Sequence, residues 1–494
     1  MKWVKRLLLL TALVSTLVVL EASAEDTLLL NIPSTEDVIK SIEDKNRQEE
    51  EIQQAIDDAV ELNQEQNQSE EYDKLFDMSL KHTFIIEFTQ DEWDGLINDM
   101  ESYYEQYGTY RSNNYRSVTV TYTVGEDTYV IEDVGIRSKG NIYSRTLPED
   151  QYGNVTEIHY MMKFNETFDL EEGTDEYTAL KKREVFEQEQ LLFKRNNTND
   201  PSYINEIFSY QLFEEAEVPV PKGTLAEVHI VIDGRVENTH LYNVFEHFDE
   251  EFIRRYLQEI PTKEVGDLYK VSYSGTLEPI YDDYLYGFRD WENNVRPIYA
   301  LETNKDNPNF EYLVQYSHSF NQPNINDRKA FIDEYFNVDT FLRAMAINVL
   351  TGNPDDYRGN GNNFLFYFDE EGVLTYLPFD YDNSFGSGWA GAEGHCNYTL
   401  CNDIYDWGFL PWNDFTIPLW DNVIMFEENK IIYEDYLMEF IESGIFSEDA
   451  YLDMFEMAEG HYGDDHVMYY DKQTFIREKI RVVTEDVEYY RNER

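Results

Sequence analysis

Basic residues are scarce in this sequence of 494 residues. It has 39 Lys and Arg against 99 Asp and Glu, which gives a formal charge of −60. A surface of this sign repels phosphate backbones, so nucleic acid is excluded as the natural ligand. The same charge attracts divalent cations and would steer a polycationic protein partner toward the molecule. The alternative is that the excess of acid serves solubility or tolerance of salt.

Cysteine is also rare, since the chain has only Cys396 and Cys401. Two cysteines cannot complete a structural zinc site by themselves. We expect a small disulfide if the protein is exported, or else two reduced thiols. Three common catalytic motifs are missing as well: the Gly-x-Ser-x-Gly elbow, the His-Glu-x-x-His zinc helix and the Walker phosphate loop. Their absence argues against the serine hydrolases, zinc proteases and P-loop enzymes that carry them.

Long apolar runs are missing after residue 24. Residues 1–24 have a basic start, an apolar run at 7–20 and an Ala-Ser-Ala end, which is typical of a cleaved secretory signal. The run is shorter than the roughly 20 residues that span a bilayer, so we expect export without stable membrane insertion, with an uncleaved anchor as the alternative. Residues 25–75 are acidic and Gln-rich, which predicts a helical or partly disordered arm.

Apolar and aromatic residues are plentiful, at 42% and 15% of the chain, so a large core can form. Strand patterns dominate from residue 82 to residue 246, and helical patterns follow. The sequence therefore predicts an α+β fold in two lobes. The β-rich lobe covers about 76–250, and the mainly helical lobe covers about 251–494.

Acidic and amide residues gather around a predicted hairpin at 352–386. A buried helix over 338–350 is followed by a glycine-rich loop with Asp355, and an aromatic strand begins at 364. The chain turns at 369–372, and the strand over 373–378 delivers Asp380 and Asp382 close to the start of the first strand. Phosphoryl transfer needs a carboxylate to accept the hydroxyl proton, and oxygen ligands for divalent ions. The alternative is a solvated acidic loop.

The order of these residues is similar to that in protein kinases. There a catalytic Asp precedes an Asn by five residues, and a metal-binding Asp follows a hairpin close to Phe-Gly. Asn360 has the five-residue spacing, whereas Asn363 lies directly before the strand and would take the metal-facing position in a slightly longer loop. We favour Asn363. A glycosidase also uses paired carboxylates, but the asparagines between Asp355 and Asp380 favour metal ligation.

The run GNPDDYRGNGNN at 352–363 and the run PFDYDNSFG at 378–386 resemble the signature of the CotH family of spore-coat kinases. They are also similar to elements of the secretory-pathway casein kinases. The resemblance implies an atypical protein-kinase-like fold that uses ATP with Mg²⁺ or Mn²⁺. It makes Asp355 the catalytic acid and Asp380 a metal ligand, with Asp382 as a second carboxylate and Asp356 as the neighbour most easily confused with Asp355.

Upstream segments carry the same resemblance. Residues 134–141, VGIRSKGN, place Arg137 and Lys139 on one side of a strand end, where both would contact phosphate unless they form a solvated strand face. In the strand at 159–165, Lys163 is the candidate lysine for the nucleotide phosphates, and an ordinary edge-strand lysine is the alternative. Glu246 ends a returning strand and would orient Lys163 or hold metal.

The resemblance also implies a function. Spore-coat members act on Ser-rich, Lys/Arg-rich proteins, so we expect a secreted Ser/Thr kinase of basic proteins that acts in a coat or at the cell surface. A CotH-like coat scaffold or surface adhesin without catalysis is the alternative, because a fold does not by itself imply activity.

Overall fold

The structure is a computed structural model that describes residues 70–142, 144–196, 199–258, 265–388, 400, 403–406, 416–469 and 471–494. The predicted signal, most of the predicted arm, and both cysteines lie outside these residues. Among the described residues, no helix is both long and apolar enough to cross a membrane.

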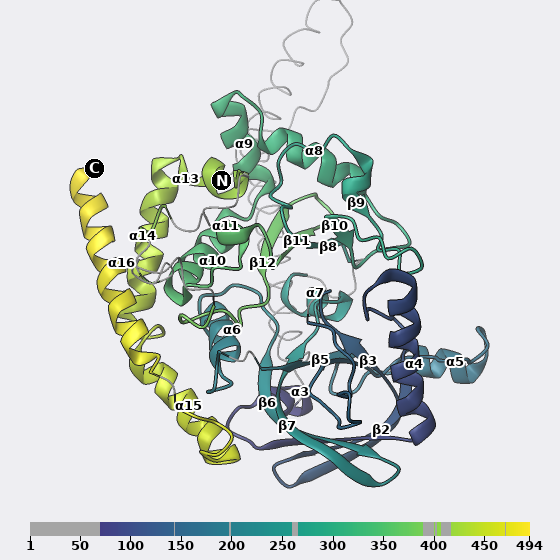
Figure 1. Cartoon of the computed structure of the whole chain (residues 1–494). Helices are drawn as coiled ribbons and strands as arrows, with labels where there is room; N and C mark the ends of the chain where they lie inside the picture. The colour runs from purple at the N-terminus through teal and green to yellow at the C-terminus, as the bar shows by residue number, and fades with distance from the viewer. Residues whose placement is uncertain are drawn as a thin grey trace, which may run out of the picture. The chain divides into compact units, whose positions relative to one another are not determined.

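Seven strands from the first half of the described chain close into a barrel in the order β1-β2-β3-β4-β5-β7-β6 (Figure 1). Neighbouring strands are antiparallel except for β1 and β6, whose parallel pairing closes the barrel. Every second residue of β2 is buried, as expected for a strand with one face toward a core. The strands are β1 (His82–Phe88), β2 (Arg116–Val124), β3 (Asp127–Lys139), β4 (His159–Lys163), β5 (Gln190–Arg195), β6 (Gly223–Ile232) and β7 (Arg235–Glu246).

A second sheet has five strands in the order β12-β11-β8-β10-β9. All five residues of β11 and of β12 are buried, because the two strands are covered on both faces. Phe364 and Phe366 belong to the largest core cluster, whereas Leu365 belongs to a smaller cluster on the opposite face. The strands are β8 (Asp267–Val271), β9 (Tyr286–Gly287), β10 (Tyr299–Leu301), β11 (Phe364–Phe368) and β12 (Leu374–Pro378).

Helices dominate the second half of the chain, and the C-terminal ones line one side of the view in Figure 1. The helix α10 is buried almost throughout and packs against α14 and α6. The helices are α3 (Glu70–Phe76), α4 (Gln90–Tyr107), α5 (Asp175–Lys181), α6 (Asn205–Glu215), α7 (Glu250–Tyr256), α8 (Phe310–Phe320), α9 (Ile325–Tyr335), α10 (Val338–Thr351), α11 (Tyr357–Asn360), α13 (Pro418–Ile424), α14 (Glu427–Glu442), α15 (Glu448–Tyr462), α16 (Gln473–Glu493) and the 3₁₀ turn η1 (Asp283–Leu285).

The α+β class is confirmed, with most strands early in the chain and most helices late. The early strands form a closed barrel, and the later half carries a sheet of its own. The likeness to the two lobes of a kinase and the domain boundaries stay predictions. The end of the predicted arm is the helix α3, which buries Tyr72 and Leu75 in the barrel's core cluster.

Candidate active site

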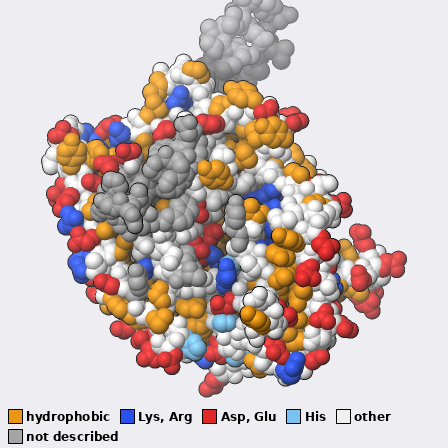
Figure 2. Space-filling view, viewed as in Figure 1, with side chains coloured by type: hydrophobic (Ala, Val, Ile, Leu, Met, Phe, Trp, Pro, Cys, Tyr) orange, Lys and Arg blue, Asp and Glu red, His pale blue; other side chains and the backbone are white. Residues whose placement is uncertain are grey.

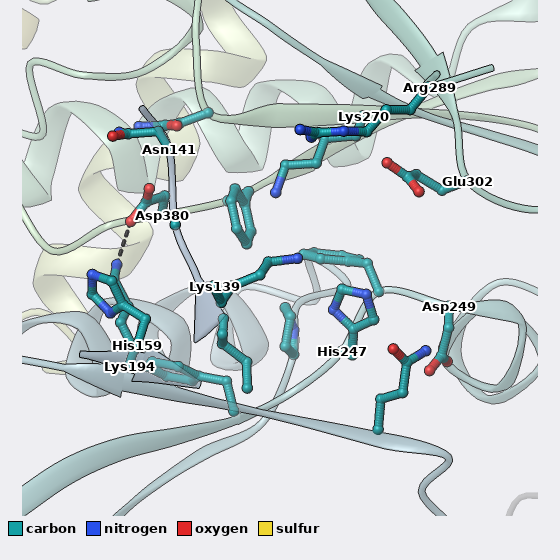
Figure 3. Close-up of a pocket in the computed structure, with 18 of the residues that line it drawn as sticks. Lys139, Asn141, His159, Lys194, His247, Asp249, Lys270, Arg289, Glu302 and Asp380 are labelled. Carbon is teal, nitrogen blue, oxygen red and sulfur yellow. Dashed lines mark hydrogen bonds and ion pairs between the residues drawn. The ribbon is translucent and has the colours of Figure 1, made fainter. Parts of the chain in front are cut away.

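One cavity of about 600 Å³ is lined by residues from both sheets. The barrel contributes side chains from β3, β4, β5 and β7, and the second sheet contributes β8 together with the loops next to β11 and β12. Figure 3 shows Asp380 and Lys194 on one side of this space, with Lys139 reaching across it. Its size is in the range of sites that bind small molecules and cofactors.

The loop with Asp355 lies between two helices whose ends are fixed by local conformation. The helix α10 ends at Gly352, which adopts the left-handed conformation with φ of 65°. Asn360 Nδ2 and Asn362 Nδ2 donate to Asp355 Oδ1 at 2.7 and 3.3 Å. Burial raises the pKa of Asp355, and the charge of Asp380 raises it further. A carboxylate with a raised pKa is a better proton acceptor.

The neighbouring carboxylate, Asp356, is fully buried and caps the short helix α11. Gly359 N–H donates to Asp356 Oδ1 at 2.6 Å, and Asn348 Nδ2 donates to Asp356 Oδ2. Burial raises the pKa of Asp356 to about 6, against the attraction of Arg358. Asp356 therefore stabilises the loop from inside, whereas Asp355 is partly exposed.

Asp380 follows β12 in the left-handed conformation, with φ of 63°. Its backbone N–H donates to Tyr210 Oη at 3.0 Å, and its side chain forms an ion pair with Lys194 of β5 (dashed in Figure 3). Lys194 Nζ also lies 2.7 Å from Glu206 Oε2 of α6 and 3.3 Å from Asp382 Oδ2. One lysine therefore contacts three carboxylates that come from two distant segments.

The charges of this cluster depend on one another. Burial alone would lower the pKa of Lys194, but Asp380, Asp382 and Glu206 raise it above its usual value. Burial raises the pKa of Glu206, and the charges of Asp380 and Asp382 add to this effect. Asp380 has the opposite shift: its pKa is lowered, because Lys194 outweighs the effect of burial.

The three carboxylates have the composition of a divalent-ion site. Oxygen atoms of Glu206, Asp380 and Asp382 lie within 4.8 Å of one another. Oxygen donors of this kind are what Mg²⁺ and Mn²⁺ prefer. Asn363, which lines the cavity as Asp380 does, donates from Nδ2 to the backbone oxygen of Asp355 at 2.9 Å. The residues therefore fit the ion that the resemblance implies.

The upstream candidates also line the cavity, but they have other partners. Lys163 Nζ lies 2.9 Å from Glu166 Oε2. Glu246 is paired with Arg255 and accepts from Tyr72 Oη at 3.2 Å. The structure does not bring Glu246 to Lys163, because β5 lies between β4 and β7 and separates the two backbones by about 10 Å.

Arg137 and Lys139 extend from the end of β3 into the cavity wall. The guanidinium of Arg137 lies 5.1 Å from the centre of the Tyr115 ring, and its Nε has no hydrogen-bond partner. Burial lowers the pKa of Lys139, and the neighbouring cations Lys270 and Arg137 lower it further. These two residues are therefore placed where an anion in the cavity would meet them.

Sequence reasoning missed Lys194 and Glu206. The signal was present, because Lys194 directly follows the apolar run 191–193, and Glu206 lies in the stretch 202–214, whose apolar residues recur at helical spacing. A strand lysine followed by a helix glutamate is the order that protein kinases use for their lysine–glutamate ion pair.

The fold and the site define an α+β protein in which a cation-lined cavity ends at a cluster of carboxylates. A comparison with protein families matches residues 163–459 to CotH, described as CotH kinase protein. The match covers more than half of the chain, so the chain belongs to the CotH family. The upstream element at 134–141 lies outside the matched residues. No curated protein matches the sequence.

Proposed function

We propose that the protein is a metal-dependent protein kinase that transfers the γ-phosphate of ATP to Ser or Thr. The observation that carries this proposal is the contact of Lys194 with Glu206, Asp380 and Asp382 beside the Asp355 loop. Phosphoryl transfer is driven by positioning and by neutralisation of phosphate charge, and this arrangement supplies groups for both.

Asp355 would accept the proton of the substrate hydroxyl while the hydroxyl oxygen bonds to phosphorus and the bond to ADP breaks. Asp380 and Asn363 would hold a divalent ion, with Asp382 as a further ligand; the bound ion would neutralise phosphate charge. Asn360 keeps the side chain of Asp355 in place rather than facing the cavity.

We assign the phosphate-pairing role to Lys194, held by Glu206, in place of Lys163. Lys163 is already paired with Glu166, and its ammonium also lies 5.4 Å from the centre of the Tyr115 ring. Arg137 and Lys139 would contact phosphate oxygens from the barrel side. In this proposal the barrel and the later half of the chain act as the two lobes of a kinase-like fold around the nucleotide.

The substrate we propose is a basic, Ser-rich protein. Acidic side chains are spread over the surface, as Figure 2 shows for one face, and they would steer Lys/Arg-rich segments toward the site. The signal-like residues 1–24 support action outside the cytoplasm, and the family supports a place in a spore coat or at a cell surface.

The test is transfer of labelled phosphate from ATP, with Mg²⁺ or Mn²⁺, to a Ser/Lys/Arg-rich peptide and to the protein itself. Asp355→Asn and Asp380→Asn should each lose about 100-fold or more in rate. Asp356→Asn is the matched control, because Asn keeps the helix cap, and it should stay within a few-fold of the parent. A parent chain that binds neither ATP nor a divalent ion would instead favour a coat scaffold or an adhesin.

A further inference from the structure

The same cavity holds more positive charge than the proposed nucleotide site uses. Besides Lys194, Arg137 and Lys139, its walls include the side chains of Arg111, Arg145, Lys270, Arg289 and Arg296, which we call the basic cluster. The chain has only 39 basic residues among 99 acidic ones, so five further cations around one cavity are unexpected. Figure 2 shows Lys and Arg side chains near the centre of this face.

None of the five cations lies within ion-pair distance of a carboxylate of the described residues. Glu302, one of the acids that line the cavity, is paired with Lys305. Arg145 instead donates to the Ser112 backbone oxygen at 2.8 Å, and Arg296 donates to the Lys270 backbone oxygen at 3.4 Å. Burial lowers the pKa of Lys270, Arg289 and Arg296, and Glu302 lies close enough to raise it in part, but one carboxylate cannot balance five cations. The excess of positive charge indicates that another anion supplies the remaining counter-charge.

Aromatic rings hold two members of the basic cluster in place without neutralising them. The guanidinium of Arg289 lies 3.6 Å from the centre of the Trp291 ring, and Lys270 Nζ lies 3.7 Å from the centre of the Phe379 ring. Such contacts position a cation and leave its remaining donors for a ligand.

Unused donors point to the same conclusion. Arg145 is only 4% exposed, and the Nε atoms of Arg111, Arg145 and Arg289 are buried without a hydrogen-bond partner. Burial, together with repulsion from the nearby Arg137, Arg289 and Arg111, lowers the pKa of Arg145 to about 8. Buried donors and mutual repulsion are costly unless an anion binds among them.

We propose that the basic cluster binds a second ligand, a small molecule with several phosphate groups, at the same time as the nucleotide. Four of its five members are arginines, whose planar forks suit phosphate oxygens. In Figure 3, Lys270 and Arg289 lie across the cavity from Lys194 and Asp380, where the proposed function places the transferred phosphate. The triphosphate of ATP, partly neutralised by its ion, and Glu302 together carry less charge than Arg137, Lys139 and the basic cluster. This inference depends on the proposed function only in where it places the nucleotide within the cavity.

The experiment is calorimetric titration of inorganic tripolyphosphate into the full chain, with and without a saturating, non-hydrolysable ATP analogue and excess Mg²⁺. Tripolyphosphate should bind in both conditions, with one molecule bound when the analogue fills the nucleotide site. Arg289→Gln and Lys270→Gln should each weaken its binding about tenfold, and both side chains are partly exposed, so these variants should fold. Arg235→Gln, a change of the same charge at an exposed hairpin tip outside the cavity, should change binding less than twofold.

Three results would overturn the proposal: no binding of tripolyphosphate, its displacement by the ATP analogue, or equal affinity in the parent and in Arg289→Gln. Citrate serves as a carboxylate probe, and binding as tight as that of tripolyphosphate would overturn the assignment to phosphate. If the chain binds tripolyphosphate through the basic cluster but binds no nucleotide, the anion site stands and the kinase proposal falls.

Discussion

Replacing Lys194 by Met is the sharpest perturbation of the carboxylate cluster. The side chains of Lys194 and Glu206 are only 12% and 4% exposed, so their charges are poorly screened by water. Removing one partner of a buried ion pair costs about 3–5 kcal/mol. The side chains of Asp380 and Asp382 are 31% and 24% exposed, so we expect a loss of stability at the lower end of this range, about 3 kcal/mol. The rate of phosphate transfer should fall by about 100-fold or more.

The loss of stability should depend on pH. Without the lysine, the three carboxylates repel one another and their pKa values rise, so the variant can relieve the repulsion by taking up protons. The loss should therefore be larger at pH 8 than at pH 6, as measured by urea unfolding at both values. Mn²⁺ should restore part of the stability of Lys194→Met, because it supplies the missing positive charge, but it should not restore transfer.

Lys163→Met is the matched control, since it removes a lysine from a neighbouring strand that lines the same cavity. Its pair with Glu166 is partly exposed, so the cost should be about 1 kcal/mol or less. Transfer should stay within a few-fold of the parent. The reasoning is refuted if Lys163→Met abolishes transfer while Lys194→Met retains it.

Two further changes test the loop around Asp355. A Cβ added at Gly359 would lie 2.2 Å from the Pro354 backbone oxygen, so Gly359→Ala should lose about 1–3 kcal/mol of stability and slow phosphate transfer. The loss is measured by thermal melting. Gly460→Ala is the control, because nothing lies within 4 Å of the added Cβ there. The pKa of Asp356 is raised from 3.8 to about 6, so its contribution to stability is complete below about pH 4 and is lost as the pH rises through about 6. The free energy of unfolding in urea should be measured for the parent and for Asp356→Asn at both pH 4 and pH 7. The difference between the two proteins should change by about 3 kcal/mol over this range, and an unchanged difference would contradict this view.

Local patterns were enough to predict the hairpin of the site. The expected helix at 338–350 is α10, and the expected strands at 364–368 and 373–378 are β11 and β12 within a residue. These elements depend on helical periodicity, aromatic strand residues and a short turn, all of which lie within a few residues of one another. The prediction of Asp355 and Asp380 in one place follows from them.

The partners of the lysines depend on the order of strands in the barrel, which local patterns do not contain. The strand β5 enters between β4 and β7, so Lys163 pairs with Gln190 while Glu246 pairs with Leu191. The sequence shows Lys163 and Glu246 as strand residues of opposite charge, but not that another strand separates them. The basic cluster was missed for the same reason, because its members are scattered from Arg111 to Arg296.

Backbone conformation is a further part of the site that the sequence conceals. Asn363, Asp380 and Phe385 have φ of 58°, 63° and 53°, although none of them is glycine. Asn and Asp tolerate this region, but a bulky residue such as Phe adopts it only when its surroundings compensate the strain. Phe385 N–H donates to the Thr351 oxygen at 2.8 Å, and the Lys472 ammonium donates to the Phe385 oxygen at 3.0 Å.

These contacts join the loop after Asp380 to the end of α10 and to the residue that precedes α16. Glycine is the usual sign of positive φ in a sequence, so the sequence does not indicate this conformation at Asn363 or Asp380. Spacing alone favours Asn360, which lies five residues after Asp355, whereas the position directly before the strand favours Asn363. The left-handed conformation places Asn363 on the cavity wall with Asp380, while Asn360 holds the Asp355 carboxylate. Thr351 and Lys472 hold the conformation of Phe385, in the loop after Asp380, from outside the motif.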